Sequence, residues 1–89
     1  MKAPYLEVTY HEGHAVAAYF YLARSSGQKS VRTQQVSGGL IIDFAANGKP
    51  IGIEITAPEQ FTLATLNRVL KELGCAPVRR ADLAPLRAA

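Results

Sequence analysis

Residues 10–14, Tyr-His-Glu-Gly-His, place two histidines and a glutamate within four positions. Imidazole nitrogens and carboxylate oxygens both bind zinc, so His11 and His14 are candidate metal ligands. A helical metalloprotease site needs its second histidine four residues after the first, where this chain has Ala15. Zinc sites need three or four ligands, and no further His or Cys lies nearby in the sequence. We therefore predict an exposed hairpin turn with no metal and no other cofactor; a third ligand from another subunit is the alternative.

Asp43 and Glu54 are predicted to lie on one face of two paired strands, with Arg32 on a neighbouring strand. Two carboxyls can act as acid and base when their environments push their pKa values apart. Catalysis also needs a pocket, and a small sheet with one helix is expected to enclose little volume. We interpret the three residues as a charged outer sheet face with a cross-strand ion pair. No catalytic residue is predicted.

Cys75 is the only cysteine and directly follows Gly74, at the end of a predicted helix. The negative end of the helix dipole disfavours a thiolate there. The sequence contains no Walker loop, dinucleotide-binding glycine loop, paired CxxC or serine nucleophile elbow. We therefore expect a protein that is not an enzyme. The single cysteine, and the lack of an apolar signal core after Met1, favour a cytoplasmic location.

Alternating apolar and polar residues predict five strands, over residues 5–10, 15–22, 30–36, 40–44 and 51–56. Asn47-Gly48 favours a tight hairpin between the last two. Their apolar rows must share one face: Leu40, Ile42 and Phe44 on one strand, and Ile51, Ile53 and Ile55 on the other. We expect an antiparallel meander of five short strands, with the polar strand 30–36 near an edge.

The strand at residues 15–22 is apolar on both faces, which predicts a central position in the sheet. Ala17, Tyr19 and Tyr21 share its second face. Because aromatic residues are enriched at protein interfaces, these three residues are candidates for contact with a second subunit. Simple exposure is the alternative.

After Pro58 the period changes, and four leucines form the stripe of an amphipathic helix: Leu63, Leu66, Leu70 and Leu73. Thr62 can cap its start and Gly74 can end it. The stripe is expected to cover the isoleucine face, giving a two-layer α+β domain over residues 1–74. Residues 75–89 are predicted to form an extended or disordered tail, or to dock on a partner through Leu83 and Leu86.

Composition and charge limit the classes of partner. Of 89 residues, 48% are hydrophobic and 19% charged, which is typical of a globular domain. No apolar run reaches the roughly 20 residues that span a membrane. The net charge of +3 lies entirely in residues 68–89. Nucleic-acid binding usually needs a denser basic stripe, so we expect no such binding from this segment.

Three segments carry a family resemblance: residues 33–36 (TQQV), 39–44 (GLIIDF) and 48–55 (GKPIGIEI). With the strands before and the helix after them, they resemble the DUF2283 family of small, uncharacterised bacterial and archaeal proteins, over residues 5 to about 73. The family's usual acidic turn residue is His11 here, and its paired glutamates are Gln34 and Gln35. The resemblance implies a sheet-plus-helix fold and a small homo-oligomer, and it brings no catalytic residues.

Two functions from different classes follow from the sequence. The first is a non-enzymatic domain that forms a homodimer through its sheet or binds a protein partner, because a chain this short buries only a thin core. The second is antitoxin-like binding of nucleic acid or of a toxin partner through the basic C-terminal quarter. A small carboxylate- or metal-dependent enzyme, built on His11, His14, Asp43 and Glu54, is the least favoured reading.

Overall fold

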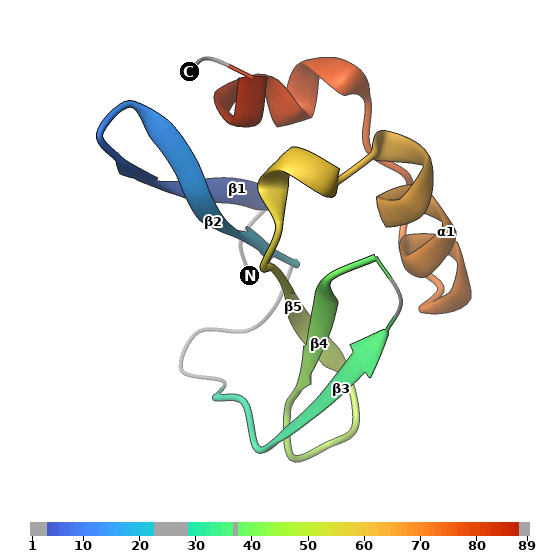
Figure 1. The fold of residues 1–89 in the computed structure, drawn as a ribbon. Helices are drawn as coiled ribbons and strands as arrows, with labels where there is room; N and C mark the ends of the chain where they lie inside the picture. Colours follow the sequence, from blue (N-terminus) through green and yellow to red (C-terminus); the bar gives the residue numbers. More distant parts are fainter. Residues whose placement is uncertain (1–3, 23–28, 37, 88–89) are drawn as a thin grey trace.

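The computed structural model describes residues 4–22, 29–36 and 38–87. Its elements are β1 (Tyr5–His11), β2 (His14–Tyr21), β3 (Arg32–Val36), β4 (Leu40–Phe44), β5 (Pro50–Ile55), the 3-10 helix η1 (Pro58–Gln60), α1 (Leu63–Glu72) and the 3-10 helix η2 (Arg80–Arg87). The predicted α+β class, a five-stranded antiparallel sheet followed by a helix, is confirmed (Figure 1). Among the described residues, no helix combines the length and the apolar character that crossing a membrane requires.

The strands follow the order β1-β2-β5-β4-β3, and all neighbouring strands are antiparallel. β1–β2 and β3–β4–β5 are local meanders. They join where β2 pairs with β5, so β5 lies between β2 and β4. β2 is thus internal and β3 forms an edge, as their compositions predict.

One face of the sheet packs against α1 and forms the core. Leu40 pairs with Ile55 and Ile42 with Ile53, which places the two predicted apolar rows on the same face. The helix covers this face with Leu66 and Leu70, both fully buried. Burial of such side chains stabilises the fold by about 1.5–3 kcal/mol each.

The helix begins and ends where its sequence predicts. The Thr62 side chain accepts a hydrogen bond from the Thr65 backbone N–H, at 3.1 Å, and so caps one of the free donors of the first turn. At the other end Gly74 has a φ of +75°, a left-handed conformation that glycine adopts without strain.

The C-terminal segment differs from the prediction of an extended or disordered tail. Residues 80–87 form η2, and Leu83 inserts into the domain's own core with 1% of its surface exposed. The Tyr10 hydroxyl on β1 donates a hydrogen bond to the Pro85 carbonyl. The physical reason is apolar burial: Leu83 covers core surface that the ten-residue α1 leaves open. Residues 88–89 lie outside the described part of the chain.

Candidate interaction site on the outer sheet face

The sheet face opposite α1, here called the outer face, carries two rows of residues that run across the strands. Cross-strand partners point to the same side of a sheet, so each row is contiguous. The first row is Tyr5, Tyr21, Gly52, Asp43 and Thr33, and the second is Glu7, Tyr19, Glu54, Ile41 and Gln35. The predicted common face of Asp43 and Glu54 is therefore present.

Tyr19 leans from the second row into the first. Its hydroxyl donates a 2.7 Å hydrogen bond to Oδ2 of Asp43, although β5 separates the two strands. The ring crosses β5 above Gly52, where any side chain would collide with the end of the Tyr19 ring. Gly52 thus provides the space through which Tyr19 reaches Asp43.

Three tyrosines form an aromatic cluster beside this hydrogen bond. Tyr5 stacks on Tyr21 with ring centroids 4.5 Å apart, and Tyr19 meets Tyr21 edge-on at 4.6 Å. The Tyr21 hydroxyl donates to Oε1 of Glu7 at 3.2 Å. Such aromatic pairs contribute about 0.5–1.5 kcal/mol beyond their burial, so the cluster is a rigid feature of the outer face.

Asp43 and Glu54 form a carboxyl pair within the two rows. Asp43 is 6% exposed, and among the described residues its Oδ1 has no hydrogen-bond partner. Desolvation raises the pKa of Glu54, and the charge of Asp43 and a hydrogen bond to it raise that pKa further. A protonated Glu54 can donate to Asp43, which would satisfy a buried acceptor that is otherwise costly to leave unpaired.

The predicted ion pair between Arg32 and this carboxyl pair is wrong. Arg32 stands opposite Phe44 in the β3–β4 register, and its Cζ lies 4.0 Å from the centroid of the Phe44 ring. Thr33, one position later, is the residue opposite Asp43. Because successive side chains point to opposite faces of a strand, Arg32 faces away from Asp43 and makes a cation–π contact instead.

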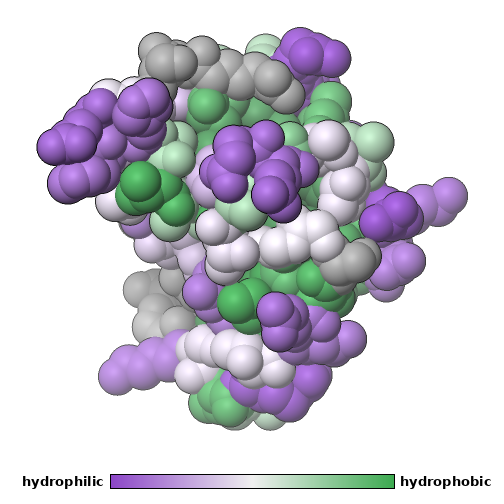
Figure 2. Space-filling view, in the orientation of Figure 1, coloured by the Kyte–Doolittle hydropathy of each residue, from purple (hydrophilic) through white to green (hydrophobic). Residues whose placement is uncertain are grey.

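The hairpin tip between β1 and β2 contains His11 and His14, which stand opposite each other and are both exposed. Glu12 and Gly13 between them have φ values of +52° and +82°, as a two-residue type I′ turn requires. Figure 2 shows hydrophilic side chains gathered around this tip. Nε2 of His11 lies 3.9 Å from Oε2 of Glu12. Within residues 4–22, 29–36 and 38–87, no three His, Cys, Asp or Glu residues are placed to share a metal ion.

Of the predicted interface residues, Tyr19 and Tyr21 lie in the aromatic cluster, and Ala17 is half-buried on the same strand. Sequence reasoning missed Tyr5, Glu7 and Gly52. A usable signal existed only for Gly52, because a glycine inside an otherwise regular strand often marks the close approach of another group.

Comparison with known proteins finds a match to one family model over part of this site. A family model described as "Protein of unknown function (DUF2283)" matches residues 15–57, which include β2 to β5 and the carboxyl pair. The match is shorter than the resemblance traced over residues 5–73. No curated protein and no solved structure matches the chain.

Proposed function

We propose that the protein, which matches the model of the DUF2283 family of unknown function over residues 15–57, is a non-enzymatic interaction domain that pairs with a second copy of itself through its outer face. The observation that carries this proposal is the cluster of Tyr5, Tyr19 and Tyr21 in the two rows of that face. α1 and η2 contribute residues to the core on the opposite side of the sheet, and no residue of the three described helical elements belongs to these rows.

The exposure of the cluster supports a role in association. Tyr5 is 49% exposed, and Tyr19, Tyr21 and Ala17 are each half-buried. Tyrosines held by ring contacts lose little conformational entropy on binding, which favours their use at interfaces. A standard interface needs about 800 Å² from each partner, and a molecule measuring 37 × 24 × 23 Å can supply that area from one broad face.

The carboxyl groups of the outer face fit self-association if their charge is reduced. Two copies placed face to face bring Glu7, Asp43 and Glu54 close to their equivalents, and like charges repel. The raised pKa of Glu54 lessens this repulsion as the pH falls, because protonation of Glu54 removes one of the negative charges. We therefore expect the dimer to become stronger as the pH is lowered toward 4.5.

The test is the mass of the protein in solution, measured by sedimentation velocity at tens of micromolar. We expect a dimer that Ala17→Lys converts to a monomer, since the substitution places a charge within the interface. Ala64→Lys is the matched control, because Ala64 is exposed on α1 and should leave the dimer intact. A wild-type protein that is monomeric at this concentration would reject the proposal, as would equal effects of the two substitutions.

The non-enzymatic part of the proposal rests on where the carboxyl pair lies. Acid–base catalysis needs a substrate pocket with groups converging on it. Asp43 and Glu54 instead lie on a sheet face, and a tyrosine hydroxyl already occupies Oδ2 of Asp43. A cytoplasmic location is proposed with it, from the single free thiol of Cys75.

Binding of nucleic acid, or of an acidic partner of the toxin type, is the second candidate. It is favoured by four exposed cations in the C-terminal quarter: Arg68, Lys71, Arg79 and Arg80. Binding to a short DNA or RNA duplex that weakens steeply with salt would support it. The same binding should disappear when these four residues are replaced by glutamine. Salt-independent or absent binding would remove this candidate.

A further inference from the structure

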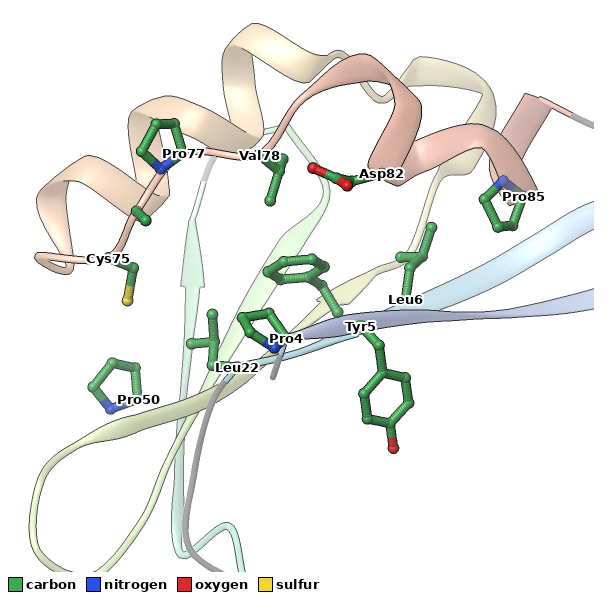
Figure 3. A pocket seen from close by; sticks show the side chains of 12 residues that line it. Pro4, Tyr5, Leu6, Leu22, Pro50, Cys75, Pro77, Val78, Asp82 and Pro85 are labelled. Atoms are coloured by element: carbon green, nitrogen blue, oxygen red, sulfur yellow. The ribbon is translucent and has the colours of Figure 1, made fainter. Parts of the chain in front are cut away.

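The helix side of the sheet contains an open cavity of about 650 Å³ between the strands and the C-terminal segment. Its floor is the start of β1 with Phe20, Leu22 and Pro50, and its roof is the segment from Cys75 to Pro85 (Figure 3). The volume lies within the range of about 300–1,000 Å³ that is usual for small-molecule sites. Neither Asp43 nor Glu54 lines this cavity, and Tyr5 is the one described lining residue that it shares with the tyrosine cluster, so the cavity needs an explanation of its own.

The roof of the cavity is held in place at both ends. Near its start, the Asn67 side chain on α1 bonds both backbone groups of Val78: Oδ1 accepts from the N–H at 2.8 Å, and Nδ2 donates to the carbonyl at 3.1 Å. Near its end, Leu83 is buried in the core and Tyr10 bonds the Pro85 carbonyl. These anchors keep the roof above the strands, so the cavity is preformed rather than a gap that collapse would fill.

The described residues that line the cavity are mostly apolar, and one of them is charged. Leu22 and Phe20 are buried, and proline rings from four positions add rigid apolar surface: Pro4, Pro50, Pro77 and Pro85. The Cys75 sulfur points from the roof toward Pro50 and Leu22 (Figure 3). Burial raises the pKa of the Cys75 thiol, which keeps it neutral and compatible with an apolar ligand.

Asp82 is the only charged residue among the described residues of the lining. Its Oδ2 accepts from the Arg79 backbone N–H at 2.8 Å and lies 3.9 Å from Nε of Arg79. Both contacts use the same oxygen, which leaves Oδ1 able to accept from a bound molecule. A carboxylate beside an apolar cavity is complementary to a molecule with an apolar body and a positively charged end.

We propose that this cavity binds a small, mainly apolar molecule whose ammonium group pairs with Asp82. The apolar body would lie between the proline rings and Phe20, and the ammonium group would face the carboxylate at the η2 end. Among the described lining residues, Tyr5 alone also belongs to the outer-face rows, and the Asp82 end of the cavity lies away from those rows.

The single cysteine provides the readout. The modification rate of Cys75 by N-ethylmaleimide is measured with octylamine, octanol or octanoate as probes of equal chain length. We expect octylamine to slow the reaction at least fivefold at saturation, octanol to do so only at higher concentration, and octanoate to have little effect. Equal protection by octylamine and octanoate would overturn the assignment of Asp82, and no protection by any of the three probes would overturn the site.

Two variants separate charge from cavity filling. Asp82→Asn keeps an oxygen acceptor for the Arg79 N–H but removes the charge. We expect the variant to bind octylamine about tenfold more weakly and to bind octanol with unchanged affinity. Ala76→Phe should fill the cavity and abolish binding of both probes, whereas Ala64→Phe on exposed α1 surface should not. Circular dichroism checks that each variant is folded, and octylamine binding is also followed by calorimetry. Unchanged octylamine affinity in folded Asp82→Asn or Ala76→Phe would contradict the proposal.

Discussion

Gly52→Ala should weaken the fold because of Tyr19, not because of the backbone of β5. An alanine methyl group at position 52 would overlap the end of the Tyr19 ring, so the ring must swing away from Asp43. Loss of a hydrogen bond to a charged, buried acceptor lowers the free energy of unfolding by about 1.5–3 kcal/mol. Replacing a strand glycine by alanine by itself raises the free energy of unfolding by about 0.5–1 kcal/mol. We therefore expect a net loss of about 1–2 kcal/mol, measured by urea denaturation with circular dichroism.

The Tyr19→Ala background provides the decisive control. Without the ring, the three atoms nearest to a side chain at position 52 are gone, so Gly52→Ala should raise the free energy of unfolding by about 0.5–1 kcal/mol instead of lowering it. Tyr19→Phe keeps the ring and removes the hydroxyl that bonds Asp43, so it should lose stability while retaining the clash. An equal loss from Gly52→Ala in the wild-type and Tyr19→Ala backgrounds would refute the crossing of β5 by Tyr19.

Three further predictions concern other parts of the chain. Because the folded state raises the pKa of Glu54, the proton on Glu54 stabilises the fold below the ordinary value of 4.5, and this stabilisation is lost as the pH rises through the raised pKa. Glutamine stays neutral, so the stability advantage of Glu54→Gln over the wild type should grow between pH 4.5 and 7.5. A constant difference between the two proteins would contradict this. Glu12→Asn should raise the free energy of unfolding by about 0.5–1 kcal/mol, since asparagine tolerates positive φ, and Glu12→Ala should not match that gain in the same urea titration. Leu83→Ala should lose about 2–5 kcal/mol in chemical denaturation because Leu83 is fully buried, while a loss near zero would mean that η2 does not complete the core.

The local parts of the fold were predictable because their signals lie within a few residues. The Thr62 cap, the leucine stripe and the Asn47-Gly48 turn each fix one element, and all three are present. Alternation also predicted which residues share the outer face. It specifies the face of each side chain but not the neighbouring strand, so the pairing of β2 with β5 could not be read from the sequence.

The candidate site was predictable only in part for the same reason. Asp43 and Glu54 were assigned to the correct face and Tyr19 to the face that it shares with Tyr21, yet the contact between Tyr19 and Asp43 depends on a strand order that no local pattern encodes. Arg32 was misplaced by one position, because a one-residue difference in register moves a side chain to the other face. Leu83 packs against core surface that α1 leaves uncovered. That surface exists only once the sheet and α1 have come together, so no local pattern in the sequence indicates it.

The strand order also determines when the outer face can exist during folding. The β1–β2 and β3–β4–β5 units close over short loops, whereas the β2–β5 junction joins segments separated by two intervening strands. Local pairings form in microseconds and distant ones more slowly, so the junction is expected to form late. The hydrogen bond from Tyr19 to Asp43 spans this junction. A partially folded chain therefore lacks the assembled outer face, and association of copies through it has to follow completion of the sheet.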